Sequence, residues 1–399
     1  MRVLVTAFVP SHFMQMVPTV WALRAAGHQV VVAGMADIVK VARTAGLPTR
    51  EIGKGSGGFT ANVKPGQLGA VKVAEPPKAQ GIPSARELAE KRPWEMMKPY
   101  WRSLVEGSTG EYVEFGRQWR ADLVLCELDF VGLVAGGALG IPTVLHRWGT
   151  DVLSPLIHEH ATAALEQTCV DLGVLGGFPY PDLVIDPCPP RLQFPGFDRT
   201  MPVRYNPYNG TGEVPDWALE RGVRRIFVSL GMLGTQSVES EWRRGLVDGI
   251  AQAVGDLGEV EVVLPFGAAA AEELGPLPSM MRLVDPVPLN LFMDNCDLVI
   301  HHGGAGTSLT ACAFGVPQLV LPQIHPAHVG CGERVAENGL GLMLPPDAVT
   351  DDPAALGKAI RALLDEPQYR HSAREMAEEM AKQPSTHELD AALRALVAR

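Results

Sequence analysis

Long apolar runs are missing from the sequence. A membrane-spanning helix needs about 18 or more consecutive apolar residues, and no run of that length occurs in the 399 residues. The apolar start, from Met1 to Phe8, is short and leads into Pro10 without a small-residue cleavage site, which argues against a signal peptide. We therefore expect a buried first strand, no stable membrane insertion and a cytoplasmic location.

Paired cysteines and clustered metal ligands are missing too. None of the six cysteines belongs to a C-x-x-C pair, and several lie in apolar strand-like or helical text, which predicts reduced, buried thiols. His301 and His302 are adjacent in the chain and cannot easily bind one ion together. The sequence therefore indicates neither a disulfide framework nor a metal site.

Charge is modest, and its balance is acidic. Charged residues make up 20% of the chain, and 34 basic against 45 acidic side chains leave a formal charge of −11. A net-acidic surface repels phosphate backbones, which excludes a nucleic-acid-coating role but not one nucleotide in a local pocket. With 46% hydrophobic residues, a chain of this length can bury a large core in two or three domains.

Along the sequence, short β-rich runs alternate with stretches of helical pattern. The strands expected in the first half are Arg2–Phe8, His28–Ala33, Asp122–Glu127 and Pro142–His146. The pattern restarts with five more expected strands at Arg225–Leu230, Glu259–Pro265, Arg282–Val284, Leu298–His301 and Gln318–Leu321. Near-continuous Val and Leu runs separated by helices are typical of parallel sheets that are covered on both faces.

The two halves are separated by Tyr205–Pro215, which is rich in Pro, Gly and Asn and has no period, as a linker would be. We therefore predict an α/β protein of two doubly wound parallel-sheet domains of similar size. Ligands of such sheets bind beyond the carboxyl ends of the strands, so two facing domains would enclose a substrate cleft.

The most informative motif is His301-His-Gly-Gly-Ala-Gly-Thr307, between an expected strand and an expected helix. Glycines at such a junction let backbone N–H groups approach an anion, and the helix N-terminus adds partial positive charge. The motif suits a pyrophosphate, although a tight turn alone would also require glycine. A second small-residue loop, with Ser229 and Gly231, follows the first strand of the second half and could face the same ligand or be a simple turn.

His12 follows the first strand, close to the start of the next helix. This position places it at a carboxyl-end loop, where a neutral imidazole can act as a base, although it also suits a helix cap or an exposed side chain. Glu127 and Asp129 end another strand of the same half. Either carboxylate could hold the far nitrogen of His12, or could instead cap the following helix, an alternative that suits Asp129.

Taken together, these motifs resemble the family 1 glycosyltransferases of the GT-B fold. The segments that carry the resemblance are Pro18-Thr-Val-Trp-Ala-Leu-Arg-Ala-Ala-Gly-His28, the V-S-L-G text at Ser229, and Cys296 to Gln323. The likeness is greatest to actinobacterial enzymes that attach deoxysugars to polyketide antibiotics. It implies two facing Rossmann-like domains with an interdomain cleft: an acceptor domain over 1–207, a donor domain over 216–382, and a C-terminal helix over 383–399 that packs back towards the first domain.

The resemblance also implies roles for single residues. His12 matches the general base, and Glu127 matches its carboxylate partner, with Asp129 as the other candidate. The donor-binding residues implied are Ser229, Gly231, Val287, Leu289, His301, Gly304, Gly306 and Thr307, with His301 on the diphosphate and the backbone at Val287 and Leu289 on the nucleobase. The family is metal-independent, so no cofactor is expected beside the sugar nucleotide.

Two departures from the family bear on the donor. Many relatives carry Trp where this chain has Pro286, so base stacking is weaker here or comes from elsewhere. Many also carry an Asp-Gln pair that holds sugar hydroxyls, whereas this chain has Ile324-His-Pro-Ala-His-Val329, and Gln323 or His328 could substitute. A deoxysugar has fewer hydroxyls to hold, which favours a TDP-linked deoxysugar over UDP-glucose.

A large apolar aglycone is the expected acceptor. Its candidate contacts, about half of which we expect to face the ligand, are Phe13, Met14, Met16, Trp94, Met97, Trp101, Phe130 and Trp148. The Trp94–Trp101 segment could equally be a helix packed on the core. The irregular stretch Gly53–Pro83 could close over the acceptor.

Other functions are compatible with the same residues. The motifs do not separate transfer to oxygen from transfer to an aromatic ring carbon. A non-catalytic nucleotide-binding partner is disfavoured by the intact His12 and glycine loop, and a dinucleotide-dependent reductase by the lack of G-x-G-x-x-G after the first strand. A monomer, a homodimer and an enzyme that needs an auxiliary protein all fit the sequence.

Overall fold

The structure is a computed structural model that describes residues 1–398 except 54–81, 128, 221, 223, 231–239, 268 and 269. The described residues form two compact units. The first contains 1–53, 89–210 and 383–398, and the second contains 82–88 and 211–382. Two features expected from the sequence lie outside the described residues: most of the stretch that could close over the acceptor, and Gly231.

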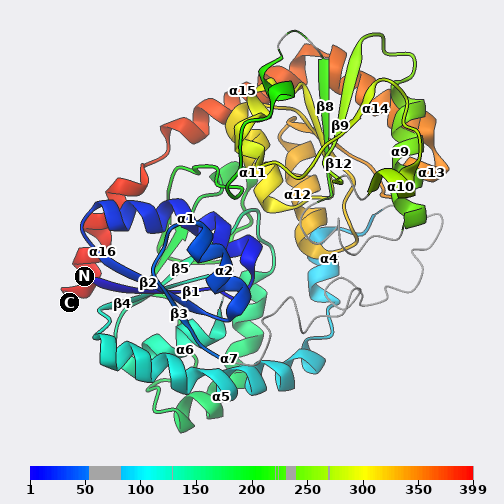
Figure 1. The fold of residues 1–399 in the computed structure, drawn as a ribbon. Coiled ribbons are helices and arrows are strands. Elements are labelled where there is room, and N and C mark those ends of the chain that lie inside the picture. Colours follow the sequence, from blue (N-terminus) through cyan, green and yellow to red (C-terminus); the bar gives the residue numbers. More distant parts are fainter. Residues whose placement is uncertain are drawn as a thin grey trace. The chain divides into compact units, whose positions relative to one another are not determined.

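The first unit is built on a parallel sheet. Within the described residues it has seven strands in the order β3-β2-β1-β4-β5-β6-β7 (Figure 1). Their bounds are β1 Arg2–Thr6, β2 Gln29–Gly34, β3 Thr49–Glu51, β4 Leu123–Cys126, β5 Thr143–His146, β6 Leu183–Asp186 and β7 Thr200–Pro202. The chain adds β1, β2 and β3 towards one edge of the sheet. It then crosses to the other side of β1 to form β4 and continues to the opposite edge, so the topological switch point lies between β1 and β4.

Helices cover both faces of this sheet. They are α1 Pro10–Ala25, α2 Ala36–Thr44, α5 Trp94–Trp119, α6 Phe130–Leu139, α7 Ser154–Asp171 and α16 Leu389–Val397, with 3₁₀ turns η1 Pro190–Leu192 and η5 Thr386–Glu388. Figure 1 shows α1 and α16 on one side of the sheet and α5, α6 and α7 on the other. Val3 and Val5 pack into the α1 side, and Leu4 between them is equally buried, as the alternation of a strand covered on both faces requires.

The second unit repeats the design. Among the described residues its parallel sheet has six strands in the order β10-β9-β8-β11-β12-β13. Their bounds are β8 Arg224–Ser229, β9 Val260–Leu264, β10 Met281–Leu283, β11 Leu298–His301, β12 Gln318–Val320 and β13 Gly341–Met343. Its helices are α9 Ser240–Val254, α10 Ala270–Leu274, α11 Ala305–Phe314, α12 Pro326–Glu337, α13 Ala348–Asp351, α14 Pro353–Asp365 and α15 Pro367–Lys382, with 3₁₀ turns η2 Asp216–Leu219, η3 Leu289–Leu291 and η4 Met293–Asn295. The division between the units passes through α4, Ala85–Glu90.

Two separate apolar clusters sandwich this second sheet. Ile226 and Val228 belong to the cluster under α9 and α14, whereas Phe227 between them packs with Trp217 and Phe292 in the other. Strands buried on both faces account for the continuous apolar text from which the parallel sheet was predicted.

All nine strands expected from the sequence are present, with ends shifted by no more than two residues. Four others, β3, β6, β7 and β13, were not predicted. Three of these have only three residues, which is too short for a periodic signal.

The C-terminal segment packs in the first unit. Leu389 and Leu393 of α16 are fully buried in the same cluster as Val3 and Phe13. Asp390 accepts a hydrogen bond from His28, with 2.5 Å between Nε2 of His28 and Oδ1 of Asp390. None of the helices in the described part of the chain is long and apolar enough to span a membrane.

Candidate active site

His12 and Glu127 meet at the switch point of the first sheet. His12 lies in the first turn of α1, and Glu127 directly follows β4. Since Thr6 of β1 pairs with Cys126 of β4, the two segments leave the sheet side by side. Nδ1 of His12 donates to Oε1 of Glu127 at 2.5 Å, and Oε2 of Glu127 accepts from the Phe8 N–H at 3.1 Å.

This pairing defines what the imidazole can do. With its proton on Nδ1 and held by a carboxylate, the neutral ring carries its lone pair on Nε2. The Glu127 side chain is only 4% exposed, whereas that of His12 is 27% exposed. The carboxylate is therefore sheltered while the ring remains accessible, which is the arrangement of a general base supported by an orienting acid.

Asp129 does not partner His12. Its carboxylate caps α6, accepting from the N–H groups of Val131 and Gly132 at 3.1 and 3.2 Å. Burial raises the pKa of Asp129 to about 6, against the lowering effect of these two N–H groups. The assignment of Asp129 as a catalytic candidate is therefore corrected: it has the helix-capping role that the sequence left open.

His301 is turned into the protein. It ends β11 and is 2% exposed. Its Nδ1 accepts from the Gly303 N–H at 3.1 Å, and its Nε2 donates to Oε1 of Gln318 at 3.0 Å. Burial, helped by the neighbouring His302, lowers the pKa of His301 to about 3. Both ring nitrogens already have partners within the protein, which argues against the expected contact of this ring with a diphosphate.

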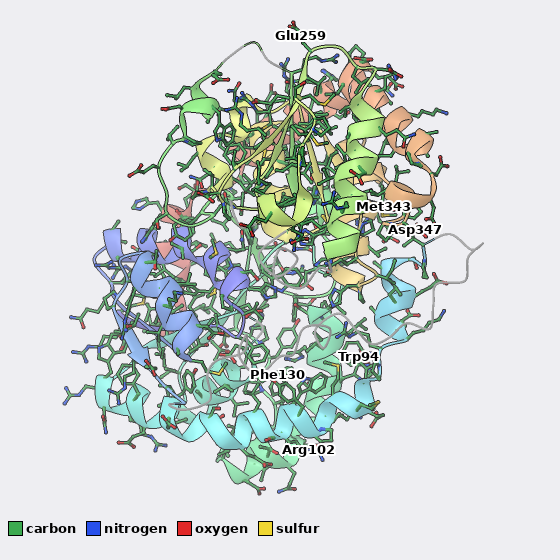
Figure 2. The ribbon with its side chains drawn as sticks, turned by 45° about the vertical axis from the view of Figure 1, so that its right-hand side comes forward. Trp94, Arg102, Phe130, Glu259, Met343 and Asp347 are labelled. Carbon is green, nitrogen blue, oxygen red and sulfur yellow. The ribbon has the colours of Figure 1, made fainter. Side chains whose placement is uncertain are left out.

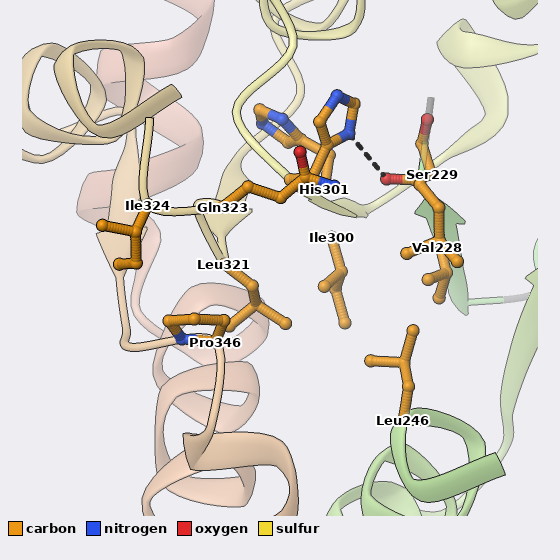
Figure 3. A pocket seen from close by; sticks show the side chains of 11 residues that line it. Val228, Ser229, Leu246, Ile300, His301, Leu321, Gln323, Ile324 and Pro346 are labelled. Atoms are coloured by element: carbon orange, nitrogen blue, oxygen red, sulfur yellow. Dashed lines mark hydrogen bonds between the residues drawn. The ribbon is translucent and has the colours of Figure 1, made fainter. Parts of the chain in front are cut away.

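His302, which the sequence analysis did not single out as a ligand contact, is placed differently. It is half-buried at the start of the glycine loop, and its Nδ1 lies 3.4 Å from the carbonyl oxygen of Ser229, the contact dashed in Figure 3. Burial lowers the pKa of His302 to about 4. A signal was available, because alternation along β11 sends its last residue, His301, into the core and leaves the next for the loop.

The glycines of this loop are required by close contacts. Gly303 has a φ of +91°, and a Cβ there would lie 2.6 Å from the carbonyl oxygen of His328. A Cβ on Gly304 would lie 2.7 Å from the ring of His302. The backbone of this loop therefore packs closely against the imidazole of His302 at the N-terminus of α11.

The N-terminus of α11 has the features of an anion site. Gly304 is its N-cap residue, and no side chain among the described residues caps this helix. Thr307 in that turn places its hydroxyl 3.4 Å from that of Ser229. Gly304, Gly306 and Thr307 therefore lie together with Ser229 as expected, in a turn whose N–H groups and dipole favour a phosphate.

A pocket of about 400 Å³ lies beside the loop that starts at His301 (Figure 3). Its polar lining residues are Ser229, His301, His302 and Gln323. The apolar ones are Val228, Leu230, Leu246, Ile300, Leu321, Ile324 and Pro346. Gln323 is exposed at the pocket, and the ring of His328 lies edge-on to that of His302, with centroids 4.9 Å apart. The pocket is thus mainly apolar, with polar groups gathered near the glycine loop.

Val287 and Leu289 follow β10 and are not among the residues that line the pocket. Their side chains are partly buried against the cluster of Trp217 and Phe292. The expected role of their backbone towards a nucleobase stays a prediction.

The candidate acceptor contacts divide by burial. Phe13 and Met16 are fully buried in the sheet-facing core, so their assignment to an acceptor site is corrected. Trp94, Trp101 and Phe130 are each less than 10% exposed and form a chain of contacting rings, with centroids 6.3 Å apart between the first two and 5.2 Å between the last two. Trp94 and Phe130 are labelled in Figure 2.

These aromatic residues therefore fit the packed-helix alternative that the sequence left open. The other three candidates, Met14, Met97 and Trp148, are half-buried and retain accessible surface. Trp148 lies against the ring of His12. Among the described residues, no group of three or more His, Cys, Asp or Glu side chains could hold a metal ion.

The chain is similar to known proteins over nearly its whole length. Residues 21–231 match the family model "Erythromycin biosynthesis protein CIII-like, N-terminal domain", and residues 250–396 match the corresponding C-terminal domain. The 10-deoxymethynolide desosaminyltransferase of Streptomyces venezuelae is 31% identical, with 96% of this chain and 94% of that protein covered. The L-demethylnoviosyl transferase of Streptomyces niveus is 34% identical, with 96% and 95% covered.

Solved structures of glycosyltransferases are also similar to this chain over nearly its whole length. The spinosyn rhamnosyltransferase SpnG superposes with a TM-score of 0.83 and 31% identity, covering 99% of this chain and all of that one. The same enzyme has been solved with thymidine diphosphate and with the spinosyn aglycone. The glycosyltransferase VinC, solved with dTDP, superposes with a TM-score of 0.77 and 27% identity.

Proposed function

Because the chain belongs to the erythromycin biosynthesis protein CIII-like family of GT-B glycosyltransferases, we propose that it transfers a deoxysugar from a TDP-sugar to a hydroxyl of a polyketide-type aglycone, with inversion at the anomeric carbon. Relatives named as transferases of desosamine and demethylnoviose support the sugar class. The neighbour solved with thymidine diphosphate supports the nucleotide.

The acceptor side of the reaction depends on His12. Nε2 takes the proton of the acceptor hydroxyl as its oxygen attacks the anomeric carbon. The new bond is oxygen to carbon, the broken bond joins that carbon to the diphosphate oxygen, and TDP leaves with the bonding electrons. Displacement in one step inverts the centre. Glu127 keeps Nε2 free to accept and stabilises the imidazolium that forms.

The donor side depends on the loop around His302. We assign the diphosphate to the N-terminus of α11, with Thr307 and Ser229 as hydroxyl donors and His302 as the ring contact in place of His301. Groups aimed at the leaving oxygens stabilise the charge that develops there. The backbone at Val287 and Leu289 is assigned to the nucleobase.

The pocket supports a sugar with few hydroxyls. Most of its lining is apolar, and Gln323 is the polar side chain on its β12 side, with His328 close by. Methyl and methylene groups of a deoxysugar suit such a surface, whereas a fully hydroxylated hexose would leave hydroxyls without partners. We therefore assign the sugar to this pocket and the acceptor to the unit that carries His12, over 1–207, with the donor bound over 216–382.

The observation that carries the proposal is the 2.5 Å contact between His12 and the sheltered Glu127. The test is His12→Ala, assayed with TDP-deoxysugars and polyketide aglycones. Loss of a general base typically costs about 10²- to 10⁴-fold in turnover. The control is His371→Ala, since that side chain is 74% exposed on α15. Near-full transfer by His12→Ala would contradict the assignment of the base.

The nucleotide is tested separately by thermal shift with TDP and UDP. A ligand at 100 times its dissociation constant stabilises the folded state by about 2.7 kcal/mol. We expect TDP to stabilise more than UDP; a preference for UDP would overturn the donor. Turnover by the purified chain in EDTA would show that neither a metal nor an auxiliary protein is needed, and sedimentation would decide between monomer and homodimer.

A further inference from the structure

The indole of Trp148 covers one face of the His12 ring. The ring centroids are 4.4 Å apart and the two planes differ by 5°, so the rings are stacked face to face. Trp148 comes from the loop after β5, whereas His12 lies on α1. Two segments far apart in sequence therefore converge on the group that we assign as the base.

The loop that carries Trp148 is anchored by the buried side chain of the preceding residue, Arg147. This side chain belongs to a residue that is only 3% exposed. Its guanidinium lies 3.4 Å from a carboxylate oxygen of Asp151 and 3.2 Å from one of Asp186, and it donates to the backbone carbonyl of Asp151 at 2.6 Å. On the other side, the Gln193 amide donates to the carbonyl oxygen of Gly149 at 2.9 Å. The backbone on both sides of Trp148 is thereby fixed.

We propose that Trp148 is a positioning residue for His12, an inference that rests on the proposed function. Glu127 holds Nδ1 and so sets the direction of the ring, and the indole sets its plane. With both constraints, Nε2 points in one direction, where the acceptor hydroxyl must present its proton. Holding the ring in one orientation keeps Nε2 aligned with the proton that it removes, which lowers the entropic cost of the reaction.

The stack also favours the charged ring. A cation over an indole face is attracted by the ring quadrupole, most strongly for Trp. His12 becomes a cation when it takes the acceptor proton, so the attraction grows as the reaction proceeds. An interaction that strengthens along the reaction raises kcat rather than lowering KM. This distinguishes the role from the acceptor contact expected from the sequence, which would change the acceptor KM.

The first test detects the stack without any substrate. In the wild-type enzyme, the ring-current field of Trp148 should shift the His12 ring protons upfield, and Trp148→Leu should return them to ordinary positions. Trp21→Leu is the matched control, because Trp21 lies on α1 with His12 but packs against the ring of Tyr208. His12 resonances that do not respond to Trp148→Leu would overturn the proposal, whatever the activity of the protein.

The second test is kinetic. Misplacement of a reacting group by about 1 Å can cost about 100-fold, so we expect Trp148→Leu to lower kcat by about 10- to 100-fold with both KM values changed little. Trp148→Phe keeps an aromatic face and should stay within about threefold of wild type. In a His12→Ala background, Trp148→Leu should cause no further loss, because its effect acts through the ring.

The outcomes separate the two proposals. A raised acceptor KM with unchanged kcat, or a Trp148→Leu loss that persists without His12, would overturn the positioning role while leaving the transferase assignment intact. Absence of TDP-sugar transfer by the wild type would instead contradict the proposed function, and the resonance test would still report whether the stack exists. If Trp148→Leu fails to fold, Trp148→Met, which also lacks an aromatic ring, carries the comparison with Trp148→Phe.

Discussion

The side-chain amide of Gln318 holds the imidazole of His301, with Oε1 3.0 Å from Nε2 of the ring. The same amide donates through its nitrogen to Sγ of Cys312 at 3.2 Å, which fixes its orientation. Since the other ring nitrogen of His301 accepts from the Gly303 N–H, this histidine supports the glycine loop from below. The next residue, His302, is the one that we propose as the diphosphate contact.

His302 should therefore take up a proton when TDP binds. Its Nδ1 donates to the Ser229 carbonyl, so Nε2 can donate to a phosphate oxygen only in the imidazolium form. Burial lowers the pKa of the free ring to about 4, and a bound diphosphate raises it by attraction. Calorimetry in buffers of different ionisation enthalpy should show proton uptake near neutral pH that His302→Ala reduces. That variant should also bind TDP about tenfold or more weakly, because a hydrogen bond to a charged group is lost.

The result expected for His302→Ala has a matched control in His371→Ala, which removes an exposed imidazole from α15. Equal proton uptake by wild type and His302→Ala would show that this ring does not bind the diphosphate.

Replacement of Glu127 should separate it from Asp129. Glu127→Gln keeps the size of the side chain but removes the charge that stabilises the imidazolium of His12, so kcat should fall by about 100-fold or more with little change in the donor KM. Asp129→Asn is the control: Asn also caps helices, and the carboxylate of Asp129 binds the α6 N-terminus rather than His12. A large loss of kcat in Asp129→Asn with a normal Glu127→Gln would reverse the two assignments. The measurement is steady-state kinetics with one donor and one acceptor.

Asp129 should instead make stability depend on pH. Its pKa is raised from 3.8 to about 6, chiefly by burial. Between these values the folded state holds a proton that the unfolded state has released, so the stabilising contribution present at low pH is lost as the pH rises towards 6. Asp129→Asn lacks this loss, and its unfolding free energy relative to wild type should increase from pH 4 to 6 and then level off. Urea denaturation at each pH measures the difference.

Comparing the variant with wild type removes other contributions from the pH test. Asp186, whose pKa burial also raises to about 6, titrates in both proteins and cancels. A difference between the two proteins that is flat from pH 4 to 7 would show that Asp129 is ionised throughout in the folded state.

Gly303 should tolerate no side chain. An alanine there must adopt a φ of +91° and place its Cβ 2.6 Å from the His328 carbonyl oxygen, so the loop or α12 must move. We expect Gly303→Ala to unfold more easily and to bind TDP more weakly. The control is Gly258→Ala in the same unit, because Gly258 has a φ of +79° but no atom within 4 Å of the added Cβ.

That control isolates the backbone term, which is about 1–2 kcal/mol for a left-handed residue. Similar unfolding costs and TDP affinities in the two variants would show that the contact with His328 is unimportant. Unfolding midpoints and TDP titrations of both variants decide the point.

The fold could be predicted to a large extent because its determinants are local. Nine strands were expected where apolar text is continuous, as in β1 and β11, since strands covered on both faces bury every residue. Strands such as β3 and β13 could not be found this way, because three residues carry no period and their pairing depends on neighbours distant in sequence.

The site was predicted in part. The motif of glycines and the position of His12 after the first strand could be found from the sequence, because each depends only on the order of strand, loop and helix. The choice between Glu127 and Asp129, and between His301 and His302, could not be made from spacing. A one-residue step along a strand or into a helix reverses the side that a side chain faces, and only packing decides it.

By itself, then, the sequence determined two parallel sheets, a glycine loop at the end of β11 and a histidine at the end of β1, since these follow from local periodicity and from the backbone freedom of glycine. The tertiary structure decided which of the candidate side chains stayed accessible and which were buried or bonded within the protein. It sent Phe13 and Met16 into the core, gave Asp129 to a helix N-terminus, and brought Trp148 onto His12. The stack of Trp148 on His12 joins segments distant in sequence, and the packing of Phe13 and Met16 depends on burial, so no local pattern encodes either outcome. The cap made by Asp129 is a local contact, and packing decided only between it and the catalytic alternative.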